Sequence, residues 1–248
     1  MTQPNLKGQI ALVTGAGKGI GRSCAVELAK AGATVIAIAR TQADLEGLAK
    51  EAGPGAGKFE TWIGDVREQA VIDRIKALPK LDILVNNAGT NKLQHIMDVD
   101  DETLDLLIGL NIRAAFKVAQ AVAGVMIKQG TGGNIVHVSS VAGHVGSKTR
   151  TLYAMTKHAV EGMTKAMAVE LAEHKIRVNA VAPTVVRTPM TAPFFKDPLY
   201  EKRAMDSIPL KQVCDPIDIA EAVLYLVSPG AKMVSGLSLM IDGAATAH

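Results

Sequence analysis

The sequence has very few cysteines and no histidines spaced as metal ligands usually are. Cys24 and Cys214 are the two cysteines in 248 residues, and they lie far apart in the chain. Two thiols in a chain of this length suggest neither a disulfide scaffold nor a zinc site. The six histidines show no paired ligand spacing. We therefore expect reduced thiols, no bound metal and a cytoplasmic location.

An excess of one charge and long uninterrupted apolar runs are also lacking. The 27 basic residues are scattered among 24 acidic ones, which leaves a formal net charge of only +3. This balance gives no support to a nucleic-acid partner. No unbroken apolar run reaches the roughly 20 residues that cross a bilayer, and the opening segment MTQPNLKG lacks the apolar part of a signal peptide. We expect neither nucleic-acid binding nor membrane association.

What the sequence does contain is an alternation of strand and helix patterns along its whole length. Hydrophobic residues make up 48% of the chain, which is enough for a sizeable core. Short apolar runs predict strands at 10–13, 34–38, 59–63, 81–85, 134–139, 177–182 and 237–241. Helical patterns predict helices at 21–31, 102–129, 152–173 and from about 215. The alternation predicts an α/β Rossmann fold, with one doubly wound parallel sheet of about seven strands and helices on both faces, as a single domain over 1–248.

A glycine-rich turn follows the first predicted strand. Gly15, Gly17, Gly19 and Gly21 stand between that strand and the first helix. Glycines allow backbone amides to approach a pyrophosphate, and the helix start adds a partial positive charge. The spacing differs from the commoner dinucleotide fingerprint, and a tight strand-to-helix connection would give a similar pattern. The turn is therefore a candidate phosphate loop that needs support from other residues.

Two cations suggest which dinucleotide such a loop would bind. The residues after the second strand meet the adenosine ribose in this fold, where an acid binds free hydroxyls and an arginine suits a 2′-phosphate. Ala39 and Arg40 offer no acid there, and Lys18 adds a second cation from the glycine turn. The pattern predicts NADP(H). The alternative for Arg40 is an ordinary solvated arginine.

A serine, a tyrosine and a lysine form the candidate catalytic group. Tyr153 and Lys157 are four residues apart, which places them on one face of the predicted helix. A cation about 4 Å from a phenol favours phenolate by about 4 kcal/mol at an effective dielectric of about 20. Ser140 follows a buried strand, where open α/β sheets bind ligands. Asn111 lies among apolar helical neighbours and needs partners, either a structural water or a catalytic one. A tyrosine–lysine pair alone is more often simply solvated.

Residues 184–210 interrupt the alternation of strands and helices. This segment is rich in proline and carries the aromatic pair Phe194 and Phe195. An insertion of this length predicts a lid or a wall of the substrate pocket. The alternative is a surface excursion held by its prolines.

Together these motifs resemble the short-chain dehydrogenase/reductase family over essentially the full length. The resemblance rests on the cofactor turn (Thr14, Gly15, Gly19, Ile20, Gly21), the strand-four motif (Asn86, Asn87, Ala88, Gly89) and the catalytic tetrad (Asn111, Ser140, Tyr153, Lys157). Within the family, the segments around Lys18, Arg40 and 183–190 are most similar to carbonyl reductases and L-xylulose reductases that use NADPH. Thr184 stands where the family usually has glycine, an exchange that xylulose reductases share.

The resemblance implies an NADP(H)-dependent oxidoreductase that interconverts a ketone or aldehyde and an alcohol. It implies that Tyr153 is the general acid and base, that Lys157 holds the nicotinamide ribose, that Ser140 binds the substrate oxygen and that Asn111 fixes a water. The implied cofactor contacts also include Asp65, Val66, Asn87, Ala88, Gly89, Pro183, Val186 and Thr188. The implied substrate pocket holds Val141, Arg150, Phe194 and Phe195.

Other members of the family remain as alternatives. They are NAD(H)-preferring polyol or sugar dehydrogenases, 3-oxoacyl reductases, and epimerases or dehydratases, which usually need a longer substrate domain. A non-catalytic dinucleotide sensor would be expected to lose Ser140, Tyr153 or Lys157, and all three are present. The resemblance also implies a homotetramer, because the Tyr153 helix has a second small or apolar face at Ala159, Met163, Ala166 and Val169.

Overall fold

A seven-stranded parallel sheet forms the centre of the protein. The computed structural model describes residues 4–247. The strands are β1 (Ile10–Thr14), β2 (Thr34–Ala39), β3 (Phe59–Ile63), β4 (Ile83–Asn86), β5 (Gly133–Val138), β6 (Ile176–Pro183) and β7 (Ser238–Ile241). They lie in the order β3-β2-β1-β4-β5-β6-β7, and each neighbouring pair is parallel. The predicted doubly wound sheet is confirmed, with strand ends shifted by a residue or two.

The strand order reverses between β1 and β4. The chain first runs outward from β1 to β3 and then returns to place β4 on the other side of β1. In open α/β sheets, ligands bind outside the carboxyl ends of the strands at such a switch point. The glycine turn after β1 and the polar residues after β4 therefore lie side by side, and the amide nitrogen of Asn87 donates to the Thr14 hydroxyl at 2.9 Å.

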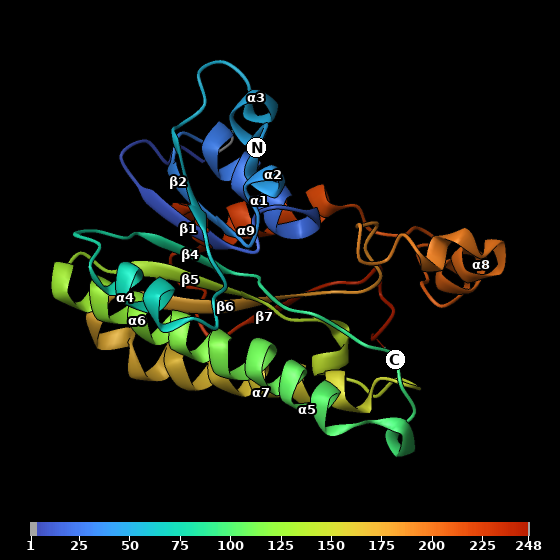
Figure 1. Ribbon diagram of the computed structural model, residues 1–248. Helices are drawn as coiled ribbons and strands as arrows, with labels where there is room; N and C mark the ends of the chain where they lie inside the picture. The colour runs from blue at the N-terminus through green and yellow to red at the C-terminus, as the bar shows by residue number, and fades with distance from the viewer. Residues whose placement is uncertain (1–3, 248) are drawn as a thin grey trace.

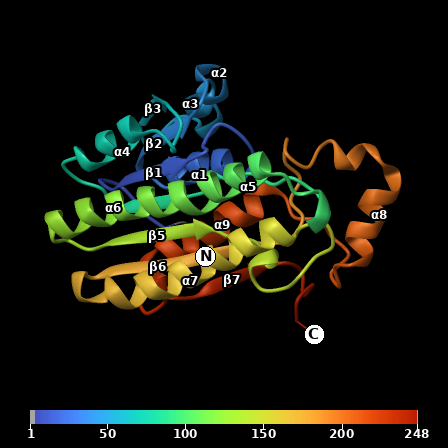
Figure 2. The same ribbon diagram turned by 60° about the horizontal axis from the view of Figure 1, so that its bottom comes forward.

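Helices cover both faces of the sheet (Figures 1 and 2). Helices α1 (Gly19–Lys30) and α9 (Pro216–Val227) pack on one face, and α4 (Gln69–Lys76), α6 (Ala115–Gln129) and α7 (Thr151–Glu170) pack on the other. The shorter helices are α2 (Gln42–Leu45), α3 (Leu48–Ala52), α5 (Asp101–Leu107) and α8 (Pro198–Asp206). The 3-10 turns are η1 (Ile96–Asp98), η3 (Val141–Gly143), η4 (Ala172–His174), η5 (Phe194–Lys196) and η6 (Pro229–Ala231).

Two apolar cores lie on opposite faces of the sheet. Val13 of β1 packs with Leu28 and Ile219 on the α1–α9 side, whereas its neighbour Leu12 packs with Val118 on the α6 side. Successive side chains of a strand point to opposite faces, so a strand covered on both sides needs apolar residues throughout. This is why the central strands are readable as continuous apolar runs in the sequence.

The long helix predicted over 102–129 is not regular. It begins as α5, widens into the π-helical segment η2 (Ile108–Ala114) and continues as α6. Asn111 lies inside η2 and is only 2% exposed. A π-helical turn breaks the usual backbone pattern and often marks a functional position. The hydrophobic spacing does not reveal it.

The same stretch, Asp101–Gln129, is long and apolar enough to cross a membrane by length and composition alone. Arg113 and Lys117 interrupt the apolar residues of this helix, yet the mean hydropathy of an 18-residue window within it reaches 1.4. Half of that window is buried within the fold, because α6 packs against β4 and α4. A core helix of a globular domain passes the same test, so this finding adds little weight to a membrane role.

The proline-rich insertion forms a projection at one end of the sheet. It follows β6 and contains η5 and α8, which lies to the side of the strands in both ribbon views (Figures 1 and 2). Asp197 caps α8 by accepting from the amide nitrogen of Leu199 at 2.9 Å. Both ends of the insertion are joined, because the amide nitrogen of Arg187 donates to the Cys214 carbonyl at 2.9 Å. The segment is thus an anchored loop with its own short helix.

Candidate active site

The glycine turn forms one wall of an open cleft at the switch point. Gly15 and Gly19 adopt φ values of +64° and +54°, which side chains rarely allow. A Cβ atom on Gly21 would lie 2.4 Å from the Gly15 carbonyl oxygen and from the Asn87 amide. The cleft encloses about 430 Å³. Glycine thus suits the backbone of the turn at 15 and 19, and at 21 it lets the start of α1 pack against the end of β1.

The hydroxyl of Thr14 organises the opposite wall. It accepts hydrogen bonds from the amide nitrogens of Asn87 at 2.9 Å and Ala88 at 3.0 Å. The side-chain amide of Asn87 donates in return to the Thr14 carbonyl at 2.9 Å. These contacts hold the ends of β1 and β4 together. They leave Gly89 facing the cleft, where an added Cβ would lie 3.2 Å from Asn111 Oδ1.

The predicted adenosine contacts line the far part of this cleft. Ala39, Arg40, Asp65 and Val66 are all found there, together with Arg67, which the sequence did not suggest. The Arg67 guanidinium binds the Asp65 carboxylate at 2.7 Å and thereby lowers the pKa of that carboxyl. Asp65 is thus ion-paired with Arg67 within the protein, in addition to its predicted contact with adenine.

Lys18, predicted as a second cation near the adenosine site, lines the cleft but is paired with an acid. Its ammonium forms an ion pair with Asp44 at 2.8 Å, and the hydrogen bond from Lys18 is the main reason why the pKa of Asp44 is lowered. Arg40 takes part in none of the ion pairs found within residues 4–247. This end of the cleft is lined by three cations and two carboxylates, so its net charge is 3 − 2 = +1. The cations are Lys18, Arg40 and Arg67, and the carboxylates are Asp44 and Asp65.

A second cavity of about 470 Å³ adjoins the cleft. Residues that line both include Ile20, Asn87, Gly89, Thr90, Thr188 and Met190. The two hollows therefore form one continuous path from Arg40 to Lys157. An extended ligand with a phosphate-bearing middle fits this path, because the glycine turn lies in its centre. The residues present thus fit a nicotinamide dinucleotide.

Ser140, Tyr153 and Lys157 meet in this second cavity. Ser140 follows β5, and its hydroxyl accepts from the amide nitrogen of Ala142 at 3.2 Å. Tyr153 is half-buried on the first turn of α7. The ammonium of Lys157 is buried, donates to the Val138 carbonyl at 2.7 Å and lies 5.6 Å from the centre of the Tyr153 ring. Three of the four predicted catalytic side chains are therefore brought together.

Asn111 lies behind the cavity and braces its walls. Its amide nitrogen donates to the Thr90 carbonyl at 2.9 Å and to the Thr156 hydroxyl at 3.1 Å. Its amide oxygen accepts from the amide nitrogen of Thr90 at 2.9 Å. Asn111 thereby links the loop after β4 to α7. Its predicted role in fixing a water remains a prediction.

Most of the residues predicted to form the substrate pocket line the substrate end of this cavity. Val141, Arg150 and Phe194 line it, as do Pro183, Val186 and Thr188 nearer the cofactor path. Phe195 does not, because its ring packs edge-on against Tyr200 at 5.3 Å and lies 5.0 Å from the Arg187 guanidinium. The sequence predicted Phe195 in this wall, and the structure places it outside the residues found to line the cavity.

Several lining residues were not predicted from the sequence. They come from separate loops and include Asn91, Val145, Ser147, Met190, Tyr200 and Thr246. Each is ordinary in its local context, and no spacing links one to another. Only the fold brings them to the same cavity, so no sequence signal marked them.

A buried histidine lies close to the candidate catalytic group. His137 on β5 is 1% exposed, and its Nδ1 lies 3.3 Å from the side-chain amide nitrogen of Asn86. Burial, and secondly the charge of Lys157, lower the pKa of His137 to about 4. The ring is therefore neutral at physiological pH and adds no positive charge beside Lys157. No motif in the sequence marks this residue.

Comparison with known proteins identifies relatives of this chain independently of the geometry of the site. The sequence model described as short chain dehydrogenase matches residues 9–199. The chain is 43% identical to L-xylulose reductase of Bos taurus, with 96% of each chain covered, and 39% identical to carbonyl reductase [NADPH] 2 of Sus scrofa, with 97% of each covered. It is also 39% identical to a 3-oxoacyl-[acyl-carrier-protein] reductase of Thermotoga maritima, over 96% of this chain and 98% of that one.

Solved structures show the same likeness. A putative NAD(P)-dependent gluconate 5-dehydrogenase from Beutenbergia cavernae, with bound NADP, superimposes with a TM-score of 0.93 at 33% identity. The match covers 98% of this chain and 99% of that one. The architecture described above is therefore shared over nearly the whole chain.

Proposed function

The chain belongs to the short-chain dehydrogenase family, and we propose that it is an NADP(H)-dependent oxidoreductase that interconverts a ketone or aldehyde and the matching alcohol. The observation that carries this proposal is the meeting of Ser140, Tyr153 and Lys157 in one cavity that continues into a glycine-lined cleft. One titratable hydroxyl and one hydrogen-bonding hydroxyl are what a carbonyl oxygen needs when it gains or loses a proton.

When bound, the nicotinamide supplies or accepts a hydride. In this proposal the phenol of Tyr153 gives a proton to the substrate oxygen during reduction and takes one during oxidation. The hydroxyl of Ser140 donates a hydrogen bond to the same oxygen, since its nearest acceptor in the fold is the Pro183 carbonyl at a long 3.5 Å. The ammonium of Lys157, 5.6 Å from the centre of the Tyr153 ring, brings a positive charge close to this proposed proton donor.

The preference for NADP(H) is supported by charge at the adenosine end. Arg40 lies in the cleft without an acidic partner in the described chain, and position 39 is alanine. A guanidinium binds a 2′-phosphate through paired hydrogen bonds, whereas an acid after β2 would repel it. The ion pair between Lys18 and Asp44 weakens the contribution proposed for Lys18, so Arg40 carries most of the preference.

The insertion over 184–210 is proposed to close over the substrate. Thr188 and Met190 border the cofactor path, while Phe194 and Tyr200 line the substrate cavity. Phe194 and Tyr200 also pack together, with ring centres 5.5 Å apart. A segment that touches both ligand sites and is anchored at its two ends is well placed to cover them. We regard the whole of 1–248 as one domain, with this segment as its lid.

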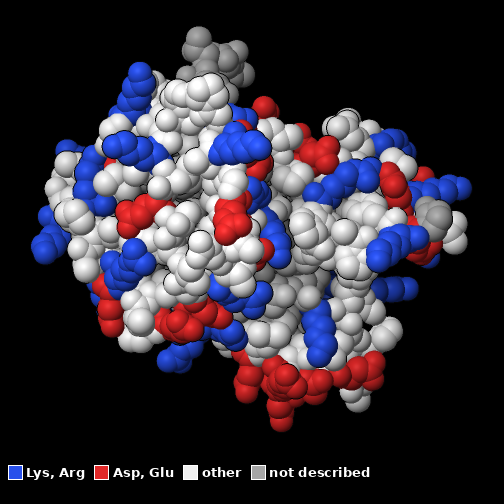
Figure 3. Space-filling view, turned by 45° about the horizontal axis from the view of Figure 1, so that its top comes forward, with Lys and Arg blue, Asp and Glu red and all other residues white. Residues whose placement is uncertain are grey.

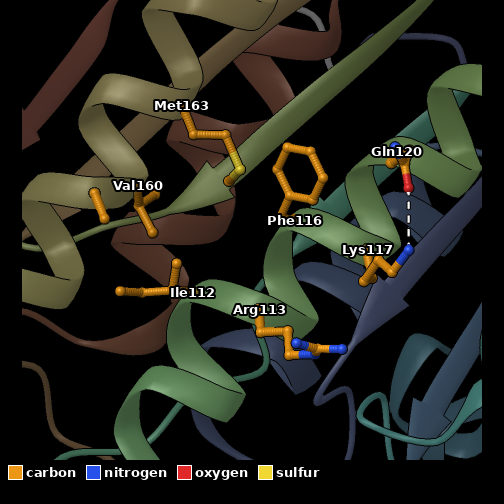
Figure 4. A pocket seen from close by; sticks show the side chains of 8 residues that line it. Ile112, Arg113, Phe116, Lys117, Gln120, Val160 and Met163 are labelled. Carbon is orange, nitrogen blue, oxygen red and sulfur yellow. Dashed lines mark hydrogen bonds between the residues drawn. The ribbon is translucent and has the colours of Figure 1, made fainter.

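We also propose a homotetramer, supported by an apolar hollow on the outer side of α6 and α7. Figure 4 shows Phe116 and Met163 facing this hollow from the two helices, with Lys117 bonded to Gln120 on its rim. It encloses about 480 Å³. The ring of Phe116 is 48% exposed and Val169 is 81% exposed. Equivalent helices from a second copy would cover these side chains.

The substrate proposed here is a moderately apolar ketone rather than an open-chain sugar. Val141, Val145, Met190 and Phe194 give the cavity an apolar wall. A polyol against that wall would lose water without gaining enough partners. Comparable specificity constants for a pentulose and for an alkyl ketone would contradict this choice.

A cytoplasmic enzyme without nucleic-acid or membrane partners is the proposed setting. On the face seen in Figure 3, basic and acidic side chains are mixed, and acids gather at its lower edge. A broad basic surface, which nucleic acid would favour, is not seen on that face.

The main alternative within the family is a 3-oxoacyl reductase, or a dehydrogenase that prefers NAD(H). The 3-oxoacyl reductase alternative is favoured by the relative from Thermotoga maritima, which has that name and is 39% identical. A non-catalytic dinucleotide sensor is less well supported, because Ser140, Tyr153 and Lys157 are all retained.

One assay distinguishes the proposed function from these alternatives. Absorbance of the reduced nicotinamide is followed with NADPH or NADH and a panel of ketones, aldehydes, sugars and acyl thioesters. No turnover with any of them would contradict the enzyme proposal.

A further inference from the structure

We propose that the substrate of this enzyme carries a carboxylate, which Arg150 binds within the catalytic cavity. This inference rests on the proposed function and narrows it from ketones in general to oxo acids and the matching hydroxy acids. It follows from an arginine that has no partner, from the charge of the cavity around it and from the strained backbone that holds it in place.

The guanidinium of Arg150 has no ionic partner in the part of the chain that the structure describes. Arg150 is half-buried and lines the cavity together with Tyr153. Two arginines of the insertion differ in this respect, since Arg187 binds Glu201 and Arg203 binds Asp197. A guanidinium has five N–H donors in a planar fork that matches a carboxylate. An unpaired guanidinium on the wall of a cavity is therefore well suited to bind an anion.

The cavity offers no internal counter-charge to this arginine. None of the lining residues found within 4–247 is an aspartate or a glutamate. The other lining cation is Lys157, whose ammonium donates to the Val138 carbonyl. Apolar walls formed by Val141, Val145 and Phe194 lower the local dielectric and strengthen the field of the guanidinium. An anion entering the cavity gains more at Arg150 than at a solvated surface arginine.

The backbone before Arg150 is strained in a way that fixes its position. Thr149 adopts a φ of +61°, which is a rare conformation for a β-branched residue. Its carbonyl accepts from the amide nitrogen of Gln94 at 3.0 Å, and the amide nitrogen of Arg150 donates to the Ser147 carbonyl at 3.3 Å. Such strain is found where a structure holds a functional residue in place. Here it sets Arg150 at the start of α7, three residues before Tyr153.

The surroundings of Arg150 leave other polar groups free for the same ligand. Helix α7 has no acid in its first turn and no side chain that caps its start. The side-chain oxygen of Asn91, which lines the same cavity, is buried without a hydrogen-bond partner in the described chain. A carboxylate accepts hydrogen bonds and therefore suits the uncapped start of α7, whereas the Asn91 oxygen is itself an acceptor and needs a donor, such as the hydroxyl of a hydroxy acid. The geometry therefore favours an oxo acid whose hydrocarbon part packs against the apolar wall.

The test compares acids with their neutral esters. Specificity constants are measured for a series of short 2-, 3- and 4-oxo acids and for the methyl ester of each, with the enzyme and NADPH. We expect the best acid to exceed its ester by about 100-fold, the size expected for charge-assisted, paired hydrogen bonds. Equal constants for every acid and its ester would overturn the inference while leaving the proposed function in place.

Variants of Arg150 test whether this residue causes the preference for acids over esters. Arg150→Met keeps the length of the side chain and should lower the constant for the best acid by about 100-fold, while that for its ester changes less than about threefold. Arg150→Lys should keep part of the preference, because an ammonium retains the charge and loses the fork. Lys165→Met removes a positive charge from the exposed side of α7 and serves as the matched control. An equal loss with acid and ester in Arg150→Met would mean that the arginine is only structural.

A binding measurement decides the inference independently of turnover. Calorimetry with a saturated carboxylic acid that cannot be reduced should detect binding to the complex of enzyme and NADP. Arg150→Met should lose that binding, whereas Lys165→Met should keep it. Failure of all substrates to react, with carboxylate binding still dependent on Arg150, would overturn the proposed function but not this site. Binding that is the same in Arg150→Met and in the wild type would overturn the site.

Discussion

The ammonium of Lys157 donates to the carbonyl oxygen of Val138 at 2.7 Å, and this hydrogen bond joins helix α7, which carries Tyr153, to the end of strand β5. The residue that follows Val138 by two positions is Ser140, so the bond fixes the distance between the two halves of the proposed catalytic group. A buried lysine must keep such a partner, because an unpaired buried ammonium is costly. One side chain therefore both holds the wall of the site and brings a positive charge beside Tyr153.

Removing that charge should damage catalysis and stability together. In Lys157→Met the Val138 carbonyl loses its donor, which costs about 1 to 3 kcal/mol of unfolding free energy. We expect kcat to fall by at least about 100-fold, because the phenol loses its nearby cation. Denaturant unfolding and initial rates check the two effects. A variant with near wild-type kcat would show that Lys157 acts only as a brace.

Tyr153→Phe should abolish turnover and leave cofactor binding nearly unchanged. The change removes the proposed proton donor and little of the shape of the cavity. Fluorescence titration with NADPH measures binding, and nicotinamide absorbance measures turnover. Met155→Leu, on the exposed side of the same helix, is the control. Activity within about tenfold of the wild type would contradict the proposed mechanism.

Assembly can be tested at the apolar hollow between α6 and α7. Met163→Glu places a charge where Phe116 and Ile112 line the hollow, so a buried interface there would be disrupted. Light scattering should report a tetramer for the wild type and a smaller species for the variant. Lys165→Glu, on the same helix but outside the hollow, should leave the mass unchanged. A monomeric wild type at micromolar concentration would rule out the tetramer.

Local sequence patterns were sufficient for the sheet and for the catalytic helix, because both depend on short-range spacing. The buried strands carry apolar residues on both faces, and Tyr153 and Lys157 are one helical turn apart whatever surrounds them. The π-helical turn at Ile108–Ala114 could not be predicted, since it changes the backbone without changing the hydrophobic pattern. Asp44 captures Lys18 from a separate helix, and no local spacing reveals that pairing.

The wall of the substrate cavity was the least predictable part. It combines residues from the loop after β4, the start of α7, the insertion and the C-terminal segment, represented by Asn91, Arg150, Tyr200 and Thr246. Phe194 and Phe195 are neighbours in sequence, yet only Phe194 reaches the cavity. Which of two adjacent aromatic residues faces a ligand depends on the packing of η5 and α8, which is a tertiary property.

The buried histidine should make the fold sensitive to acid. The pKa of His137 is lowered to about 4 in the folded protein, whereas an unfolded histidine titrates near 6.5. Between these values the unfolded chain binds a proton that the folded chain does not, so stability falls as the pH falls from about 6.5 to 4. The loss reaches about 3 kcal/mol at 1.36 kcal/mol per unit. Above about pH 6.5 this effect is absent.

His137→Asn should remove this dependence, because asparagine does not titrate. Urea unfolding of both proteins between pH 7 and pH 4 measures it, and the wild type should lose about 3 kcal/mol more than the variant. His174→Asn, a change at a partly exposed surface histidine, controls for loss of a histidine in general. Parallel pH profiles for the wild type and His137→Asn would show that His137 is protonated in the fold.

Cofactor choice should depend on Arg40 and on the absence of an acid before it. NADPH differs from NADH by a 2′-phosphate, which a guanidinium binds through charge-assisted hydrogen bonds of about 1.5 to 3 kcal/mol each. The pairing of Lys18 with Asp44 reduces what Lys18 can add, so we expect a preference for NADPH of about 10- to 100-fold. The double change Ala39→Asp and Arg40→Leu should reverse it, since an acid there binds free ribose hydroxyls and repels the phosphate.

The control for this double change is Lys50→Glu, which alters the net charge by the same two units at an exposed position on α3. It should leave the ratio of the specificity constants for NADPH and NADH unchanged, because a solvated charge at the surface is screened by salt. Asp44→Asn adds a second comparison. It frees Lys18 from its ion pair and should raise the NADPH preference by several-fold if Lys18 faces the phosphate. A wild-type enzyme whose constant for NADH equals that for NADPH would mean that Arg40 is a solvated arginine, and that the net positive charge of the cleft does not select the cofactor.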